Sequence, residues 1–216
     1  LQKKTVVIHN GIDLDYFQPR EKSKNLLKKF NIQGDDIVFV SVAGTALHKG
    51  WQFLVEATSK LDNELRKNIK IIIVGNSPKD EIMRQYVNQL NMQNNVIFTG
   101  FMDDVREVVS IADIGFVLSI GVETISFACR EMMSMGKPVL VSAYAGLSEN
   151  INNNQNGWGV KQKSSNQVYK FLQKINELDL QQYAYMAKQK ANQEFGSVKF
   201  VNSTIDLYRK IKGTGL

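Results

Sequence analysis

Short, continuously apolar runs alternate with amphipathic stretches along most of the chain. The runs predict strands, and they occupy residues 37–44, 70–75, 95–100, 114–119 and 138–143. Most of the stretches between them carry apolar residues at helical spacing. Runs without polar alternation are typical of parallel strands buried on both faces. Strands that alternate with helices of about 10 to 15 residues indicate βαβ units. The pattern therefore predicts an α/β fold with a doubly wound parallel sheet.

Both ends of the chain add elements to this plan. The β-branched run at residues 5–10 ends at Asn10-Gly11, a strong turn signal, and predicts a short strand. Residues 156–160 predict a last short strand, and three helices are expected from about residue 164 onward. No change of composition marks a second domain. We therefore expect residues 1–216 to form a single domain, and the start at Leu1 rather than Met suggests part of a longer protein.

Two carboxylates lie close together at the centre of the chain. Glu123 falls in the loop after the run 114–119, and Glu131 lies eight residues later, in a helix expected to begin near Ile125 and to end at Gly136. The amides of Ile125, Ser126 and Phe127 would lack intrahelical partners there, and the helix dipole would favour an anion. On this prediction Glu131 lies about 9 Å from the helix tip. The arrangement predicts a ligand with a diphosphate at the tip and hydroxyl groups on either side.

Composition narrows the function classes. The chain has 43% hydrophobic and 22% charged residues, no apolar run near the ~18 residues of a membrane span, and no signal-peptide pattern. Its single cysteine, Cys129, cannot form an internal disulfide, so we expect a reducing, cytoplasmic location. His9 and His48 lack metal-ligand spacing, and neither a G-x-G-x-x-G nor a P-loop motif is present. Paired carboxylates also suit a glycosidase, but here both come from one strand–helix unit.

The net charge of +6 arises after residue 151, where ten Lys or Arg residues stand against four acids. Two interpretations stay open: a solvated helical face, or peripheral contact with an anionic membrane or a phosphorylated substrate. No aromatic residues are interleaved with the basic ones as a base-stacking surface requires, so nucleic acid is not expected as a partner.

The ordered motifs resemble a known family. NGID, FVSVAGTALHKG, IIIVG, VIFTGF, ADIGFVLS, E-x7-E, GKPVLVS and NGWGV follow one another as in the C-terminal half of retaining GT-B glycosyltransferases of the glycosyltransferase-4, or group 1, type. The resemblance covers nearly the whole chain. It implies a Rossmann-like domain, one half of a GT-B fold, that binds a nucleoside-diphosphate sugar donor.

The resemblance also implies roles for individual residues. Glu131 would accept hydrogen bonds from the ribose hydroxyls, and Glu123 would contact the transferred sugar. Lys49 resembles the family's phosphate-contacting lysine, where a cation would stabilise the departing nucleoside diphosphate. Glu123 and Lys49 are thus the expected catalytic residues. The other expected donor-binding positions are Thr124, Ile125 and Ser126 at the diphosphate, Phe101 and Met102 at the base, and Gly44 in the loop before the lysine.

Three departures from the family pattern stand out. Ala43 and Gly44 occupy the region where an arginine is usual, so one phosphate contact is in doubt. The usual G-F-G after the first glutamate reads Thr124-Ile125-Ser126, where Ser126 could donate its hydroxyl to phosphate instead. The N-terminal, acceptor-binding domain of the family is absent from this chain.

These inferences lead to one expected function and to alternatives. We expect the donor-binding domain of a retaining glycosyltransferase that uses a UDP-, GDP- or ADP-linked sugar, in cell-surface polysaccharide or lipopolysaccharide synthesis. We expect no metal and no cofactor. The isolated chain should bind the nucleotide but transfer no sugar. The first alternative is a non-catalytic nucleotide-sugar-binding or partner-binding domain, and the second is a basic module that binds nucleic acid or membrane through its C-terminal helices.

Overall fold

Six parallel strands form the centre of the molecule. The structure is a computed structural model and describes residues 5–76, 79–121 and 123–213. Their order across the sheet is β3-β2-β1-β4-β5-β6, and every pairing is parallel. The strands are β1 (Ile37–Ser41), β2 (Ile69–Ile73), β3 (Val96–Phe98), β4 (Ile114–Val117), β5 (Val139–Ser142) and β6 (Gly157–Val160). The predicted doubly wound parallel sheet is therefore confirmed.

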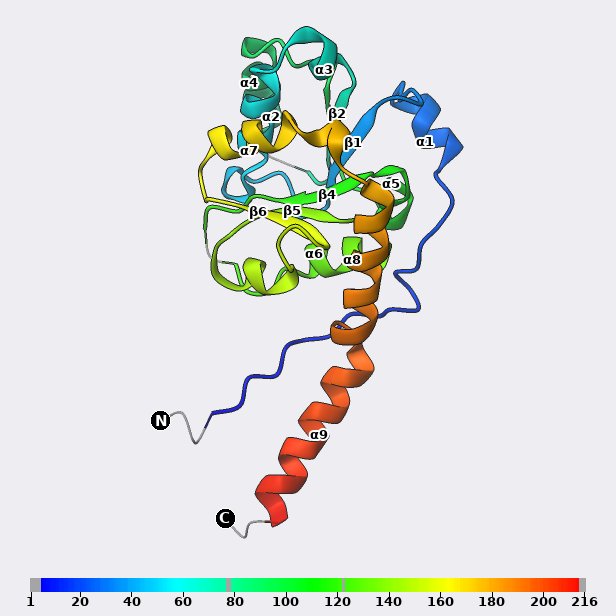
Figure 1. Ribbon diagram of the computed structural model, residues 1–216, viewed down its shortest axis with the longest axis vertical. Helices are drawn as coiled ribbons and strands as arrows, with labels where there is room; N and C mark the ends of the chain where they lie inside the picture. Colours follow the sequence, from blue (N-terminus) through cyan, green and yellow to red (C-terminus); the bar gives the residue numbers. More distant parts are fainter. Residues whose placement is uncertain (1–4, 77–78, 122, 214–216) are drawn as a thin grey trace.

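Helices cover both faces of this sheet, so its central strands are buried on both sides (Figure 1). One face carries α2 (Trp51–Ser59), α3 (Asn63–Lys67), α4 (Asp80–Gln89) and α7 (Ser165–Leu172). The other carries α1 (Lys24–Lys29), α5 (Val105–Ile111), α6 (Phe127–Ser134) and α8 (Leu180–Glu194). The connections between these elements include three short 3₁₀ helices: η2 (Leu47–Lys49), η3 (Ala145–Asn150) and η4 (Ile175–Glu177).

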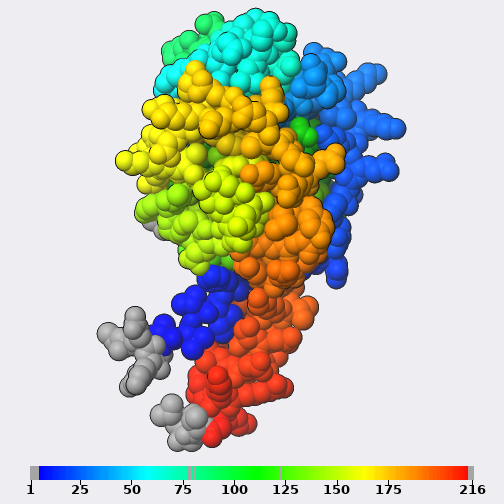
Figure 2. All heavy atoms as spheres, viewed as in Figure 1, coloured from blue at the N-terminus to red at the C-terminus, as the bar shows by residue number. Residues whose placement is uncertain are grey.

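The predicted strand at residues 5–10 is wrong. This segment is extended but pairs with no strand of the sheet, and Val6 and Val7 are 61% and 78% exposed. β-branched residues favour a strand only where a neighbouring strand and a core accept them. The segment instead runs close to α9 (Ser197–Gly213), and both project from the body of the domain (Figures 1 and 2).

Two predicted helices have different bounds in the structure. The central helix begins at Phe127 rather than near Ile125, because Ser126 has a φ of +48° and acts as the N-cap. It ends before Gly136, which has the positive φ that a helix stop favours. The first of the three helices expected from about residue 164 onward is divided into α7 and η4. Helix α3 was not predicted at all, because its five residues are too few to show a periodic apolar pattern.

The fold brings the chemically interesting loops to one edge. Because the strands are parallel, the loops after β1, β2, β3, β4 and β5 all lie at the carboxyl ends of the strands. The strand order reverses between β1 and β4, and ligands of such sheets bind at this crevice. The loops that follow β1 and β4 carry Lys49 and Glu123.

Candidate functional site

Lys49 and Glu123 form an ion pair across the switch point of the sheet. Lys49 Nζ lies 2.6 Å from Glu123 Oε1. The two loops are packed tightly: Ile120 N donates to the His48 carbonyl at 2.8 Å, and a Cβ at Gly50 would come within 1.8 Å of the Leu118 carbonyl oxygen. The φ of Gly50 is also +77°, so glycine is required here on two grounds.

Within the described residues, one oxygen of the Glu123 carboxylate accepts hydrogen bonds. Oε1 accepts from Lys49 and also from the hydroxyl of Ser119, at 2.7 Å. The Glu123 side chain is 9% exposed and that of Lys49 24%. Among the residues that the structure describes, none donates to Oε2. Glu123 is therefore anchored through one oxygen and retains an acceptor for a ligand.

Glu131 has a different environment. It lies in the second turn of α6, half-buried, and no side chain or amide in the described ranges donates a hydrogen bond to its carboxylate. Burial raises the pKa of this carboxyl, with no other influence acting on it. A partly desolvated carboxylate without donors is energetically unfavourable until hydroxyl or amide groups reach it.

The start of α6 supplies donors between the two acids. The Ser126 hydroxyl accepts from the Cys129 amide at 3.4 Å, so its own proton remains free for an acceptor. The amides of Phe127 and Ala128 occupy the first helical positions, which have no intrahelical acceptor. The predicted donor amides thus shift by about two residues: those of Ile125 and Ser126 precede the helix, and Thr124 is exposed in the loop.

The positions expected at the base lie in the loop after β3. Phe101 is 70% exposed, and with Met102 it lines a cavity of about 380 Å³ beside Lys29 and Phe30. The backbone amide of Phe101 donates a hydrogen bond to Asn76 Oδ1 at 2.7 Å. Gly44, in the loop after β1, has a φ of +95°.

Residues 22–193 match the sequence profile of the family Glycosyl transferases group 1. The chain belongs to this family. A glycosyltransferase from Methanocaldococcus jannaschii is 28% identical over 172 residues, which cover 77% of this chain and 43% of the relative. The chain thus spans less than half the length of that relative.

Two solved structures share the fold. The crystal structure of Anabaena HepE in complex with UDP superposes with a TM-score of 0.85 at 20% identity, over 97% of this chain and 58% of that one. That of WaaG, a glycosyltransferase involved in lipopolysaccharide biosynthesis, gives 0.79 at 21% identity, over 94% and 56%. These likenesses confirm the Rossmann-like GT-B architecture.

Several residues that organise the site of this group 1 chain were missed by the sequence reasoning. Ser119 is fully buried, and its carbonyl accepts from Ser142 at 2.8 Å while its hydroxyl holds Glu123. Asn76 joins the loops after β1 and β3, because its carbonyl accepts from Thr45 and its side chain from Phe101. Ser119 is the last residue of a predicted strand, and Asn76 directly follows the glycine that ends another. A polar side chain at the carboxyl end of a strand is the signal that could have identified them.

Proposed function

We propose that this chain is the donor-binding domain of a retaining glycosyltransferase and binds a nucleoside-diphosphate sugar at the carboxyl edge of its sheet. The observation that carries the proposal is one strand–helix unit with two carboxylates in different environments. Glu123 is held by Lys49 at the switch point, and Glu131 is half-buried and receives no hydrogen bond from the residues that the structure describes. The fold shared with HepE, which was solved with UDP and with UDP-glucose, supports a nucleotide-sugar ligand.

In this proposal the diphosphate lies at the start of α6. The free amides of Phe127 and Ala128 and the Ser126 proton point to an anion, which the helix dipole also favours. Lys49 adds the cation. Cleavage of the glycosidic bond leaves extra negative charge on the departing nucleoside diphosphate, so a fixed ammonium stabilises the transition state more than the ground state.

The two acids divide the hydroxyl groups of the donor between them. The ribose hydroxyls donate the hydrogen bonds that the carboxylate of Glu131 does not receive from the described residues. Glu123 takes a sugar hydroxyl on Oε2 while Oε1 keeps Lys49 in place. We propose that Phe101 and Met102 contact the base, on the opposite side of the switch point.

The surface of α9 supports a partner domain. Val198, Val201, Ile205 and Tyr208 follow one another at helical spacing, and each is at least 40% exposed. An apolar stripe on a projecting helix is typical of a contact surface. We propose that it packs against the acceptor-binding domain that the family resemblance implies.

Titration calorimetry of the 216-residue chain with UDP, GDP and ADP tests the donor site. We expect one of the three to bind, and we expect no glycosyl transfer from its sugar conjugate by this chain. Absence of binding by all three would contradict the proposed function. Measurable transfer by the chain alone would contradict the proposed division into domains.

A non-catalytic nucleotide-sugar-binding or partner-binding domain remains the second candidate. Ser126 holds a positive φ of +48° at a position where the resembled family has glycine. This altered backbone would fit a site that keeps binding but has lost chemistry. A transfer assay on the full-length protein separates the two candidates.

The pathway and location stay predictions. WaaG acts in lipopolysaccharide biosynthesis, and we propose a related role in cell-surface polysaccharide synthesis, on the cytoplasmic side, with peripheral contact to an anionic membrane. No helix in the described ranges has both the length and the apolar character needed to cross a bilayer. A site without metal or cofactor is likewise proposed and awaits a test.

A further inference from the structure

Arg130 is a buried cation that joins segments far apart in the sequence. It lies on α6 next to Glu131 and is 1% exposed. Its Nη1 donates to the Asn10 carbonyl at 2.7 Å and its Nε to Asn150 Oδ1 at 2.9 Å. Its guanidinium lies 4.5 Å from the centre of the Phe195 ring. One side chain therefore connects the N-terminal segment, η3 and the end of α8.

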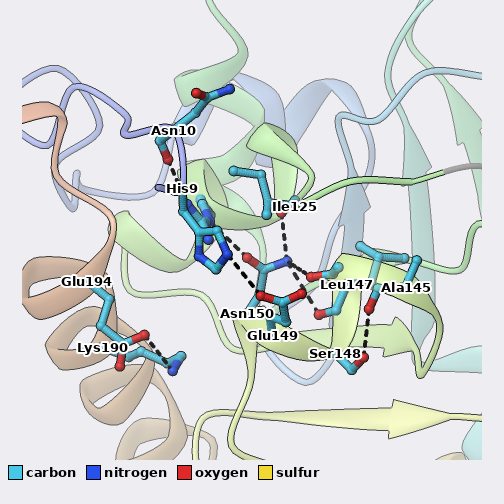
Figure 3. Close-up of polar contacts among 12 residues, drawn as sticks. His9, Asn10, Ile125, Ala145, Leu147, Ser148, Glu149, Asn150, Lys190 and Glu194 are labelled. Atoms are coloured by element: carbon cyan, nitrogen blue, oxygen red, sulfur yellow. Dashed lines mark hydrogen bonds and ion pairs between the residues drawn. The ribbon is translucent and has the colours of Figure 1, made fainter. Parts of the chain in front are cut away.

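Asn150 continues this connection to the candidate site. It is fully buried, and its Nδ2 donates to the Ile125 carbonyl at 2.7 Å, with the carbonyls of Gly146 and Leu147 at 3.3 Å (Figure 3). A Cβ at Gly146 would come within 2.0 Å of the Thr124 carbonyl oxygen, so the two loops are in direct contact. The loop before α6 therefore packs directly against η3, which holds its backbone in place.

The other end of the network reaches both chain segments that leave the domain. Ile12 N donates to the Phe195 carbonyl at 2.7 Å, and Ser197 N donates to the Ile12 carbonyl at 2.9 Å. These bonds join the N-terminal segment to the start of α9. His9 adds a contact to Glu149, the residue before Asn150, at 3.0 Å (Figure 3). Arg130 therefore lies between the candidate site and the two connections to the rest of the protein.

A structural role alone does not explain this choice of residue. No carboxylate of the described residues lies within ion-pair distance of the Arg130 guanidinium, although the charges of Glu149 and Glu194 act on it from farther away, and its hydrogen bonds go to two neutral oxygens. Burying a cation without a paired anion is costly, and a hydrophobic residue of similar volume would fill the same space at less cost. What arginine supplies, and an apolar side chain does not, is directional contact with several segments at once.

We propose that Arg130 and Asn150 are positioning residues that hold loop 124–126 in its diphosphate-binding geometry and couple it to segments 9–12 and 195–197. The proposal rests on the proposed function for its ligand. Binding at the loop changes the positions of the Ile125 carbonyl and α6, and the network transmits this change to the two segments.

Asn150→Asp is the sharpest variant. Aspartate keeps the size of the side chain and an acceptor for Arg130, but places an oxygen opposite the Ile125 carbonyl where a donor was. The matched control is Asn95→Asp. Asn95 is also buried, and its Nδ2 bridges the carbonyls of Arg66 and Ile69 at 2.7 and 2.8 Å, at the opposite edge of the sheet. Both variants lose an amide donor to backbone carbonyls, and Asn150→Asp also places a carboxylate against the Arg130 guanidinium. The comparison is therefore made on ligand binding and amide exchange, not on the melting temperature.

Only the variant near the site should weaken UDP binding. We expect Asn150→Asp to raise the Kd for UDP about tenfold or more, which corresponds to ~1.4 kcal/mol, and Asn95→Asp to leave it within about twofold. Arg130→Lys, which keeps the charge but cannot reach both oxygens, should resemble Asn150→Asp. Equal Kd values for Asn150→Asp and Asn95→Asp would overturn the positioning role.

Amide hydrogen exchange provides the second readout, and its first part uses only the unaltered chain. In the unaltered chain, UDP should slow exchange at residues 9–12 and 195–197 as well as at 124–127. Slowing confined to 124–127 would overturn the coupling. Without any ligand, Asn150→Asp should speed exchange at 124–127 and Asn95→Asp should not; unchanged exchange there contradicts the proposal even if UDP does not bind. Lack of UDP, GDP and ADP binding by the unaltered chain is instead a failure of the proposed function.

Discussion

Glu123 and Glu131 lie eight residues apart in one strand–helix unit, yet the fold treats them in opposite ways. Glu123 is almost fully buried, and its Oε1 accepts from a lysine and a hydroxyl. Glu131 is half-buried, and no donor from the described part of the chain reaches it. The first carboxylate has hydrogen bonds to one oxygen before any ligand arrives, whereas the second has none from the described residues.

Two glutamates of one motif can therefore contribute to different properties, one to folding stability and the other to ligand binding. Replacing Glu123 removes a contact that holds two loops together, so it costs folding stability. Replacing Glu131 removes a partly desolvated charge, so the folded chain without ligand loses nothing. The cost of losing Glu131 should appear only when a ligand is present.

The largest expected effect is on folding stability. Glu123→Ala should lower the free energy of unfolding by about 2 kcal/mol, because it leaves Lys49 partly buried without its anion and Ser119 without its acceptor. Urea unfolding of the chain without ligand measures this loss. Asp206→Ala is the control, since it removes a far more exposed ion pair with Arg209 on α9 and should leave the unfolding midpoint nearly unchanged. Equal shifts in the two variants would show that the Lys49–Glu123 pair is no more than a surface contact.

The next effect concerns nucleotide affinity. Glu131→Gln should weaken binding of the preferred nucleoside diphosphate at least tenfold, about 1.4 kcal/mol, because two charge-assisted bonds from ribose hydroxyls become neutral ones. Calorimetry on both forms of the chain measures the ratio. An unchanged dissociation constant would remove Glu131 from the site.

A smaller effect separates sugar from nucleotide. Glu123→Gln keeps the size of the side chain, and we expect it to bind the bare nucleoside diphosphate within about twofold of the unaltered chain. Its affinity for the matching nucleotide-sugar should fall about fivefold, near 1 kcal/mol, since a sugar hydroxyl loses a charged acceptor. If both ligands weaken equally, Glu123 contacts the nucleotide, and the sugar contacts must be sought in η3.

The smallest effect is a pH dependence of stability at Glu131. Burial raises its pKa above the ordinary 4.5, so the unfolded chain releases this proton at a lower pH than the folded chain does. The folded state is therefore favoured below pH 4.5 and loses that advantage as the pH rises through the folded pKa. Glu131→Gln lacks this titration. Its free energy of unfolding relative to the unaltered chain should increase between pH 4 and pH 7.5, by under about 1 kcal/mol. A constant difference across this range would contradict a desolvated carboxylate.

Much of the fold follows from local patterns. Apolar runs without alternation predicted five of the central strands and their parallel arrangement, because strands buried on both faces need no polar side. The strand predicted at residues 5–10 is wrong for a related reason. A β-branched run such as that around Val7 becomes a strand only if a neighbouring strand pairs with it.

The candidate site divides along a similar line. By itself the sequence determined that Lys49, Glu123 and Glu131 have the chemistry to bind a diphosphate and hydroxyls, since side-chain chemistry and the strand–loop–helix order are local. Their roles stay predictions. Only the tertiary structure decided that Lys49 would pair with Glu123, that Glu131 would lack a donor, and that Arg130 would reach Asn10 and Asn150. These contacts join residues up to 120 positions apart. Burial and pairing across such separations arise from how loops and helices pack around the sheet, and no local pattern specifies that packing.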